Sequence, residues 1–311
     1  MSPAVNAPEI AKAARILRGG GLVAFPTETV YGLGADATSD RAVAQVYEVK
    51  GRPFFNPLIV HVPDFVAAEK LGEFSEVARR LAAAFWPGPL TIVVPRQKDC
   101  PVSTLASAGL PSLALRVPAH PVAQALLKEV ERPIVAPSAN PSGRMSPTTA
   151  DHVRARLGSK VDFILDGGRC AVGVESTIVG FLGNAPELLR PGGIAREEIE
   201  RVMGHRLAKP PATDAPVAPG QLESHYAPHA QLRLDAETCR PGEIYLGFGA
   251  RDGDRNLSAS GDLVEAAANL FRMLHELDET GAKSIAVAPI PHQGLGEAIN
   301  DRLRRAAAPR S

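Results

Sequence analysis

The chain has 311 residues, 45% of them hydrophobic, so it can bury a sizeable core and has room for two domains. Its 34 Lys and Arg residues equal its 34 Asp and Glu residues in number, which argues against nucleic-acid or membrane binding by the molecule as a whole, though not by a local basic patch. Cys100, Cys170 and Cys239 lie far apart without a CxxC pair, which disfavours structural zinc or a disulfide framework and favours a reducing, cytoplasmic location. No apolar run approaches the ~20 residues of a membrane span, and the N-terminus lacks the apolar core of a signal peptide.

The first elements predicted in chain order form a strand–helix–strand unit rich in polar side chains. An amphipathic helix precedes a buried strand at 21–25, which runs into a predicted tight turn at 31–34. The helix that follows delivers Lys50 and Arg52, and a second strand returns through 58–62. Ligand sites in open α/β sheets form at such strand ends, so this unit predicts a site for an anion.

Helices and strands continue to alternate in the rest of the first domain. Amphipathic spacing predicts helices at 65–71, 75–85, 121–130, from a Thr148 or Thr149 cap to 157, and 197–203. Short apolar runs predict strands at 91–95, 112–118, 133–136, 163–165, 173–179 and 188–190.

Several of these segments end in polar or charged side chains. A buried arginine at the end of a strand, as predicted for Arg116, needs an anionic partner, which is either a protein carboxylate or a substrate carboxylate. The loop at 137–143, PSANPSG, is dense in hydroxyl and amide groups, and Arg190 precedes another turn. The predicted strand at 173–179 carries Glu-Ser-Thr in succession at 175–177, and because strand residues alternate between faces, part of this triplet must point inward or line a cavity.

The sequence divides into three parts. We predict a catalytic domain at 1–207, a linker rich in Pro and Ala at 208–230, and a small α/β domain at 231–311. In the last part, strands at 243–248 and 284–288 alternate with helices at 263–277 and 296–306. The arginines of its basic end predict a solvated helix terminus: Arg302, Arg304, Arg305 and Arg310.

Familiar nucleotide and hydrolase motifs are absent or weak. The chain has no P-loop sequence and no GxSxG nucleophile elbow. Residues 32–37 match the dinucleotide pattern GxGxxA, but the region where that pattern needs an acidic residue carries Lys50 and Arg52. No His and Cys cluster has metal-ligand spacing, so we expect no metal held by protein side chains and only Mg²⁺ carried by nucleotide phosphates.

The polar groups that remain suit phosphate and carboxylate. The phosphate-type donors are Lys50, Arg52, Asn56, Ser138, Asn140 and Arg190. Arg116 adds a partner for a carboxylate. This set predicts a nucleoside triphosphate beside a small anionic substrate, and hence adenylyl transfer or ligation.

Several motifs in order resemble the Sua5/YciO/YrdC family in its two-domain Sua5 form. They are PTETVYGLG (26–34), Lys50 and Arg52, NPLIVHV (56–62), WPGPLT (86–91), LRVP (115–118), PSANPSG (137–143), GVESTIV (173–179), LLRPGGI (188–194) and HYAP (225–228). The resemblance covers residues 7 to about 230, and the last domain fits by position and pattern. It implies a YrdC-like twisted mixed sheet with flanking helices, followed by a small Rossmann-like α/β domain. The family linker carries basic residues that the stretch 218–228 lacks, so a linker cation is not expected at the phosphates.

The resemblance implies L-threonylcarbamoyladenylate synthase activity. Members make threonylcarbamoyl-AMP and pyrophosphate from L-threonine, bicarbonate or CO2, and ATP, with Mg²⁺ accompanying the ATP. The product passes to a tRNA threonylcarbamoyl transferase, which forms N6-threonylcarbamoyladenosine at position 37 of ANN-decoding tRNAs. The resemblance leaves open whether this chain binds tRNA directly.

The family pattern also assigns site residues, position by position. It implies an ATP site formed by Lys50, Arg52, Asn56, Ser138, Asn140, Ser146, Arg190 and Tyr226, with Tyr226 closing over the nucleotide from the linker. It implies a threonine site formed by Thr29, His61, Arg116, Ala136 and Ser176. Lys50 and Arg52 would act as the catalytic cations by stabilising phosphate charge, and no covalent nucleophile is expected.

Three other interpretations stay open on sequence alone. The first is a non-catalytic RNA-binding module of the same fold, which would need a basic concave face. The second is a nicotinamide-dependent oxidoreductase built on the GxGxxA segment. The third is an inactive regulatory paralogue, although every motif position is present.

Overall fold

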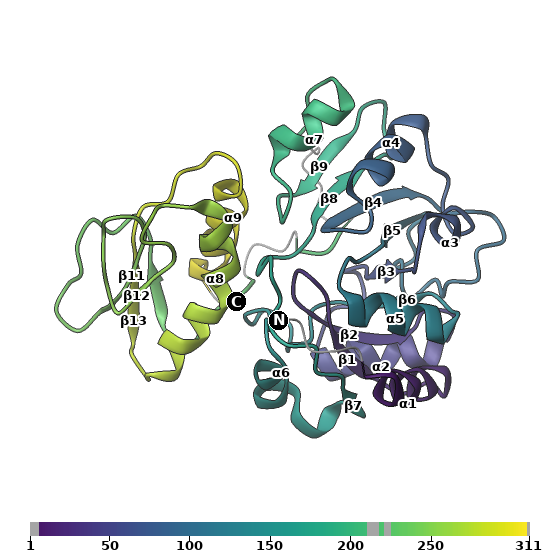
Figure 1. Cartoon of the computed structure of the whole chain (residues 1–311), viewed down its shortest axis with the longest axis horizontal. Coiled ribbons are helices and arrows are strands. Elements are labelled where there is room, and N and C mark those ends of the chain that lie inside the picture. Colours follow the sequence, from purple (N-terminus) through teal and green to yellow (C-terminus); the bar gives the residue numbers. More distant parts are fainter. Residues whose placement is uncertain (1–5, 210–217, 221–224, 310–311) are drawn as a thin grey trace.

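The computed structural model describes residues 6–209, 218–220 and 225–309, which form two bodies on separate β-sheets (Figure 1). The larger body carries a nine-stranded mixed sheet, and the smaller body a four-stranded parallel sheet. The predicted α/β class, with a large mixed sheet and a smaller second α/β domain, is confirmed. Within the described ranges, no helix is long and apolar enough to cross a membrane.

The strands of the large sheet lie in the spatial order β7-β1-β2-β6-β3-β5-β4-β8-β9. Their bounds are β1 Val23–Pro26, β2 Tyr31–Asp36, β3 Ile59–His61, β4 Leu90–Pro95, β5 Ser112–Arg116, β6 Ile134–Val135, β7 Phe163–Ile164, β8 Thr177–Gly180 and β9 Glu187–Arg190. The helices of this body are α1 Ala7–Arg18, α2 Asp40–Lys50, α3 Phe65–Glu69, α4 Glu76–Phe85, α5 Pro121–Val130, α6 Ala150–Leu157 and α7 Arg196–Met203, with a 3-10 turn at Gly158–Lys160.

Side chains from the large sheet enter cores on both of its faces. In β1, Val23 and Phe25 join the core under α1 and α5, whereas Ala24 joins the core under α2, α4 and α6. Ser75 and Thr149, the second of which is one of the two predicted caps, accept hydrogen bonds from the first turns of α4 and α6. As β1 shows, the alternation of side chains along a strand decides which face of the sheet each residue points to.

The predicted tight turn at 31–34 is wrong, because these residues belong to β2, which pairs antiparallel with β1. The reversal lies just before it, where the Thr27 hydroxyl donates 2.7 Å to the Val30 carbonyl. Gly32 is a packed strand residue: a Cβ there would lie 3.0 Å from the Cβ of Ala136. The GxGxxA segment is thus a buried strand and not a phosphate-binding loop.

Two of the element boundaries that differ from the sequence prediction concern polar residues of the site. Helix α2 ends at Lys50 because Gly51 adopts a left-handed conformation with φ of 60°, so Arg52 lies outside the helix. Strand β8 begins at Thr177, so Glu175 precedes the strand in an irregular segment. Both differences leave the polar residues on loops beside strand ends, where backbone alternation does not constrain their direction.

The smaller body is a parallel sheet in the spatial order β10-β13-β11-β12 with two helices. Its bounds are β10 Gln231–Arg233, β11 Ile244–Gly247, β12 Arg255–Asn256, α8 Leu263–Glu279, β13 Ser284–Val287 and α9 Gly296–Ala307. The sequence predicted β11, β13 and both helices but missed β10 and β12, which are two or three residues long. Figure 1 shows α8 and α9 on the side of this sheet that faces the large body.

The two bodies meet closely along these helices. Gly173 has φ of 76°, and a Cβ there would lie 2.5 Å from the carbonyl oxygen of Ala267 in α8. The ring of His275, also in α8, stacks at 4.0 Å on His152 of α6. Much of the predicted linker, 210–217 and 221–224, lies outside the described residues.

Candidate active site

One stretch of the large sheet's face carries polar side chains instead of apolar ones. In the parallel pair β3 and β5, His61 lies opposite Arg116, and both residues are at most 4% exposed. Two residues earlier on the same strands, Ile59 and Ala114 join a small apolar cluster with Ala218 of the linker region. The polar patch therefore lies between the area covered by α1 and α5 and the area covered by the linker.

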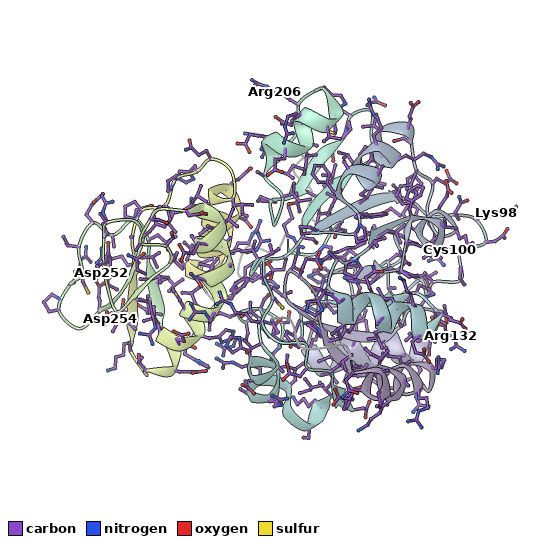
Figure 2. The ribbon with its side chains drawn as sticks, viewed as in Figure 1. Lys98, Cys100, Arg132, Arg206, Asp252 and Asp254 are labelled. Carbon is purple, nitrogen blue, oxygen red and sulfur yellow. The ribbon has the colours of Figure 1, made fainter. Side chains whose placement is uncertain are left out.

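This patch forms the floor of a cavity with about 490 Å³ of free space, including its open mouth. The wall comes from six segments: the β1–β2 turn, the residues after α2, the 136–138 loop, the segment before β8, the end of β9, and the linker. The lining residues are Thr29, Val30, Arg52, Ile59, His61, Arg116, Ala136, Pro137, Ser138, Glu175, Ser176, Arg190, Pro219, Gly220, His225 and Tyr226. Figure 2 shows Lys98, Arg132, Arg206 and Asp252 on the outer rim of the molecule, and none of them lines the cavity.

Arg116 has a protein carboxylate as its partner, which is one of the two kinds of anionic partner that the sequence left open for it. Its Nη2 donates 2.7 Å to Oε1 of Glu28, and its Nε donates 3.3 Å to the Gly88 carbonyl. The other carboxylate oxygen of Glu28 accepts 2.9 Å from the backbone amide of Ala119. Among the described residues, Nη1 of Arg116 has no hydrogen-bond partner, so one arm of the guanidinium remains available in the cavity.

His61 is neutral beside this arginine. Burial, reinforced by the charge of Arg116, lowers the pKa of His61 to about 3. Its Nδ1 lies 3.3 Å from the Ile59 carbonyl, and its ring packs edge-on against Phe25. A neutral imidazole in this position offers polar contact without adding to the positive charge.

Lys50 and Arg52 are buried and hold the loops around the cavity. Nζ of Lys50 donates 2.5 Å to each of the carbonyls of Ser138 and Asn140. Burial, reinforced by Arg52, lowers the pKa of Lys50 well below its usual range. Arg52 donates to the carbonyl and side-chain oxygens of Asn56, at 3.0 and 2.6 Å, and burial lowers its pKa to about 10, so it stays charged.

Arg190 and Ser176 join β9 to the segment before β8. The guanidinium of Arg190 donates to the Ser176 carbonyl at 2.8 Å and to its hydroxyl at 3.2 Å. The same hydroxyl lies 2.7 Å from that of Thr91 on β4. This chain of contacts fixes a buried arginine, 4% exposed, at the cavity wall.

Glu175 is the one carboxylate among the described lining residues. It accepts hydrogen bonds from the Ser146 hydroxyl and, at 2.7 Å, from Nε of Arg302 in α9. Burial alone would raise the pKa of Glu175, but Arg302 and Arg190 outweigh burial and lower that pKa to about 2. The predicted solvated end of α9 is therefore wrong for Arg302, which is 1% exposed; Arg304 is exposed and Arg310 lies outside the described residues.

The linker closes the remaining side. Tyr226 is 1% exposed, has φ of 68°, and packs on Phe271 of α8 with ring centroids 5.5 Å apart. Its neighbour His225 also lines the cavity, and burial lowers the pKa of His225 to about 3. The Nδ1 atom of His225 has no hydrogen-bond partner among the described residues, a state that is costly for a buried polar atom unless a ligand supplies the bond.

The structure gathers the sequence-predicted residues unequally. All of the predicted threonine residues line the cavity: Thr29, His61, Arg116, Ala136 and Ser176. Of the predicted ATP residues, Arg52, Ser138, Arg190 and Tyr226 line it. Lys50, Asn56, Asn140 and Ser146 lie directly behind the wall, each bonded to a wall residue or its loop.

Four contributors to the site were not assigned a site role from the sequence, although the triplet 175–177 was expected to point inward or line a cavity. Glu28 and Glu175 are acidic residues inside quoted motifs, and Glu175 directly precedes Ser176, which was a usable signal; the pairing of Glu28 with Arg116 was not visible in the sequence. His225 adjoins Tyr226 and carried the same signal. Arg302 gave none, because its contacts span more than a hundred residues and depend on how the two bodies dock.

Family models match both parts of the chain. A model described as "Telomere recombination", for Sua5, YciO and YrdC, matches residues 15–192. A second, described as the C-terminal domain of threonylcarbamoyl-AMP synthase, matches residues 194–308. Together the two matches span nearly the whole chain.

Relatives that match over nearly their full length contain both parts of the chain. Proteins named threonylcarbamoyl-AMP synthase from Pyrococcus abyssi and Bacillus subtilis are each 42% identical, over 95% and 98% of this chain and 93% and 94% of their own lengths. The crystal structure of P. abyssi Sua5 complexed with L-threonine has a TM-score of 0.90 at 40% identity, covering 98% of this chain and 95% of that one. The Escherichia coli YciO structure, at 24% identity and a TM-score of 0.56, shares the fold of the larger body over 60% of this chain. The chain therefore belongs to the Sua5/YciO/YrdC family and has the two-domain architecture of its threonylcarbamoyl-AMP synthases.

Proposed function

We propose that the cavity binds ATP and L-threonine and converts them, with bicarbonate or CO2, into threonylcarbamoyl-AMP and pyrophosphate. The observation that carries this proposal is the convergence of Arg52, Arg116 and Arg190, each at most 7% exposed, on one cavity. Buried cations that converge on a cavity create a strong preference for an anionic ligand. Relatives of matching length carry the name of this activity, and one related structure holds L-threonine.

The reaction requires two bond-forming steps. The threonine amine attacks the carbon of CO2 and loses a proton, which gives N-carboxy-threonine. The new carboxylate then attacks the α-phosphorus of ATP, and the bond to the β-phosphate oxygen breaks to release pyrophosphate. Negative charge spreads over phosphate oxygens during the second step, so fixed positive groups and positioning supply the catalysis.

On the threonine side, Arg116 would pair with the amino acid's carboxylate. Glu28 already fixes one arm of the guanidinium, so the fork is oriented before the substrate arrives. His61, Thr29 and Ser176 would provide neutral polar contacts to the amine and hydroxyl. Threonine differs from serine by one methyl group, so discrimination should reach only ~1–3 kcal/mol.

On the nucleotide side, Arg52 and Arg190 would bind phosphate oxygens, and Ser138 would add a hydrogen bond from its loop. Lys50 would support that loop through its two carbonyl contacts and add charge behind it. Mg²⁺ would arrive as part of the Mg–ATP substrate and reduce the charge of the β and γ phosphates. The described cavity wall is cationic with one engaged carboxylate, a donor set that suits phosphate and not a protein-held metal.

We further propose a cytoplasmic role in tRNA modification, with the product transferred to a tRNA threonylcarbamoyl transferase. We propose that the chain divides into a catalytic domain at 1–207, a linker at 208–230 that brings Tyr226 over the nucleotide, and a C-terminal domain at 231–311. A non-catalytic RNA-binding module is disfavoured, since relatives of matching length are named as synthases. An oxidoreductase is disfavoured because the GxGxxA segment is a buried strand.

The test is pyrophosphate release from ATP by the full chain, measured with and without L-threonine and with and without bicarbonate. We expect release that requires all three substrates, and identification of threonylcarbamoyl-AMP by mass spectrometry. Release that is independent of threonine, or no release under any combination, would refute the proposal. Serine in place of threonine serves as the matched substrate control.

A further inference from the structure

Arg302 is the largest fully buried side chain of the described residues, although it lies on the C-terminal domain and far from the other site residues in sequence. Its guanidinium donates 2.7 Å to Glu175, 2.6 Å to Asp301 and 3.0 Å to the Pro191 carbonyl. It also lies over the ring of Tyr226, 5.1 Å from the centroid. One side chain of α9 therefore touches the segment before β8, the end of β9 and the linker.

The contacts with Glu175, Pro191 and Tyr226 reach the cavity wall. Glu175 and Tyr226 line the cavity, and Pro191 follows Arg190, which lines it too. The neighbour Asp301 is itself held by Arg305, at 3.0 Å, so Arg302 is anchored within α9 before it reaches across. A planar guanidinium with several donors suits such a junction better than a flexible ammonium would.

The negative charge of Glu175 inside a cationic cavity suggests what the contacts of Arg302 do. Glu175 is a carboxylate in a cavity that we propose to hold a triphosphate, and like charges in a buried site repel strongly. Burial lowers the pKa of Lys50 and the pKa of Arg190, and the negative charge of Glu175 partly opposes that lowering at both groups. Without another cation, Glu175 would compete with the phosphates for these two groups.

We propose that Arg302 is a positioning residue, supplied by the C-terminal domain, that holds Glu175 so that the cations of the cavity remain available to the phosphates of the nucleotide. The inference rests on the proposed function, because it assumes that the cavity binds ATP. It gives the C-terminal domain a direct part in nucleotide binding. The cavity is then incomplete without α9.

The test measures ATP affinity by calorimetry in the absence of threonine and bicarbonate, so that no turnover is needed. We expect Arg302→Met to weaken ATP binding about tenfold or more, equivalent to about 1.4 kcal/mol, and threonine binding by less than about twofold. Arg302→Lys keeps the charge, so we expect ATP affinity within about threefold of wild type. Adding Glu175→Gln to Arg302→Met removes the competing carboxylate and should recover at least about threefold of the loss.

The matched control is a second ion pair between the two bodies. Arg196 of α7 donates 3.1 Å to Glu297 of α9, with both side chains about a third exposed and away from the cavity lining. Glu297→Gln should leave ATP affinity unchanged. Three outcomes would overturn the inference. Glu297→Gln could weaken ATP binding as much as Arg302→Met does, or the double variant Glu175→Gln/Arg302→Met could show no recovery. The third is a folded Arg302→Met variant that binds ATP like wild type. Failure of the proposed function would appear separately, as absent pyrophosphate release by a wild type that still binds ATP.

Discussion

Replacing Arg116 tests the assignment of the threonine side most directly. The side chain is 4% exposed, and its ion pair with Glu28 measures 2.7 Å. Removing one partner of a buried, hydrogen-bonded charge pair in a binding site costs about 2–5 kcal/mol. We therefore expect Arg116→Met to raise the KM for threonine by about thirtyfold or more, since 1.4 kcal/mol corresponds to a factor of ten.

The same change leaves Glu28, whose side chain is 12% exposed, as a carboxylate with only the Ala119 amide as a partner, so a loss of stability must be separated from a loss of binding. The double variant Glu28→Gln/Arg116→Met removes the stranded charge and should recover thermal stability but not threonine affinity. Arg116→Lys keeps the charge without the fork and should fall between wild type and Arg116→Met.

The assay is pyrophosphate release over a threonine titration, combined with direct measurement of ATP affinity. ATP affinity should stay within about twofold of wild type, because Arg116 lies with the threonine residues and not with the nucleotide residues. A threonine KM within about threefold of wild type in folded Arg116→Met would refute the reasoning. An equal loss of ATP and threonine affinity would refute it as well.

Three further predictions follow from the geometry. Arg52→Ala should lower turnover by about 10²-fold or more at saturating substrates while circular dichroism shows a folded protein; a rate near wild type would contradict its role. ATP binding should raise the lowered pKa of Lys50, because a polyanion favours the charged amine, so proton uptake should appear as pH rises through that lowered pKa; calorimetry over a pH series in buffers of different ionisation enthalpy should detect this, and Lys50→Met should abolish it. Burial lowers the pKa of His275 to about 3, so its contribution to stability is complete above pH 6.5, the unperturbed value, and is lost as pH falls toward 3. A His275→Phe variant should therefore show a shallower acid loss of thermal stability than wild type, and an unchanged pH profile would argue that the stack with His152 has no such effect.

Most helices and strands were predictable, because the residues that specify them lie within a few positions of one another in the sequence. Helix α5 was predicted with its observed bounds, since Pro121 fixes the first turn and apolar residues recur at helical spacing to Val130. The short strands β10 and β12 were missed because two or three residues carry too little pattern. The Gly32 segment was misassigned because glycine signals a turn unless long-range packing requires the absence of a Cβ, which Ala136 does here.

The site residues were predictable from motifs, but their partners were not. The sequence left the partner of Arg116 open, and only the fold brings Glu28 within 2.7 Å of it. The basic end of α9 was expected in solvent because arginine is rarely buried, and Arg302 is buried because Glu175 and Asp301 neutralise it. Such pairings depend on contacts between segments that no local window contains.

The position of the cavity explains why two domains are needed. We placed the site at strand ends, and His61 and Arg116 are indeed the last residues of the parallel neighbours β3 and β5, side by side in a mixed sheet. None of the described residues that line the cavity belongs to a helix, so buried cations there would meet water unless another segment excluded it. Tyr226 of the linker, packed on Phe271, provides that cover, and Arg302 connects the same helical layer to Glu175. Electrostatic stabilisation is strongest where water is excluded, so docking of the second domain should set the strength of every charged contact in the cavity.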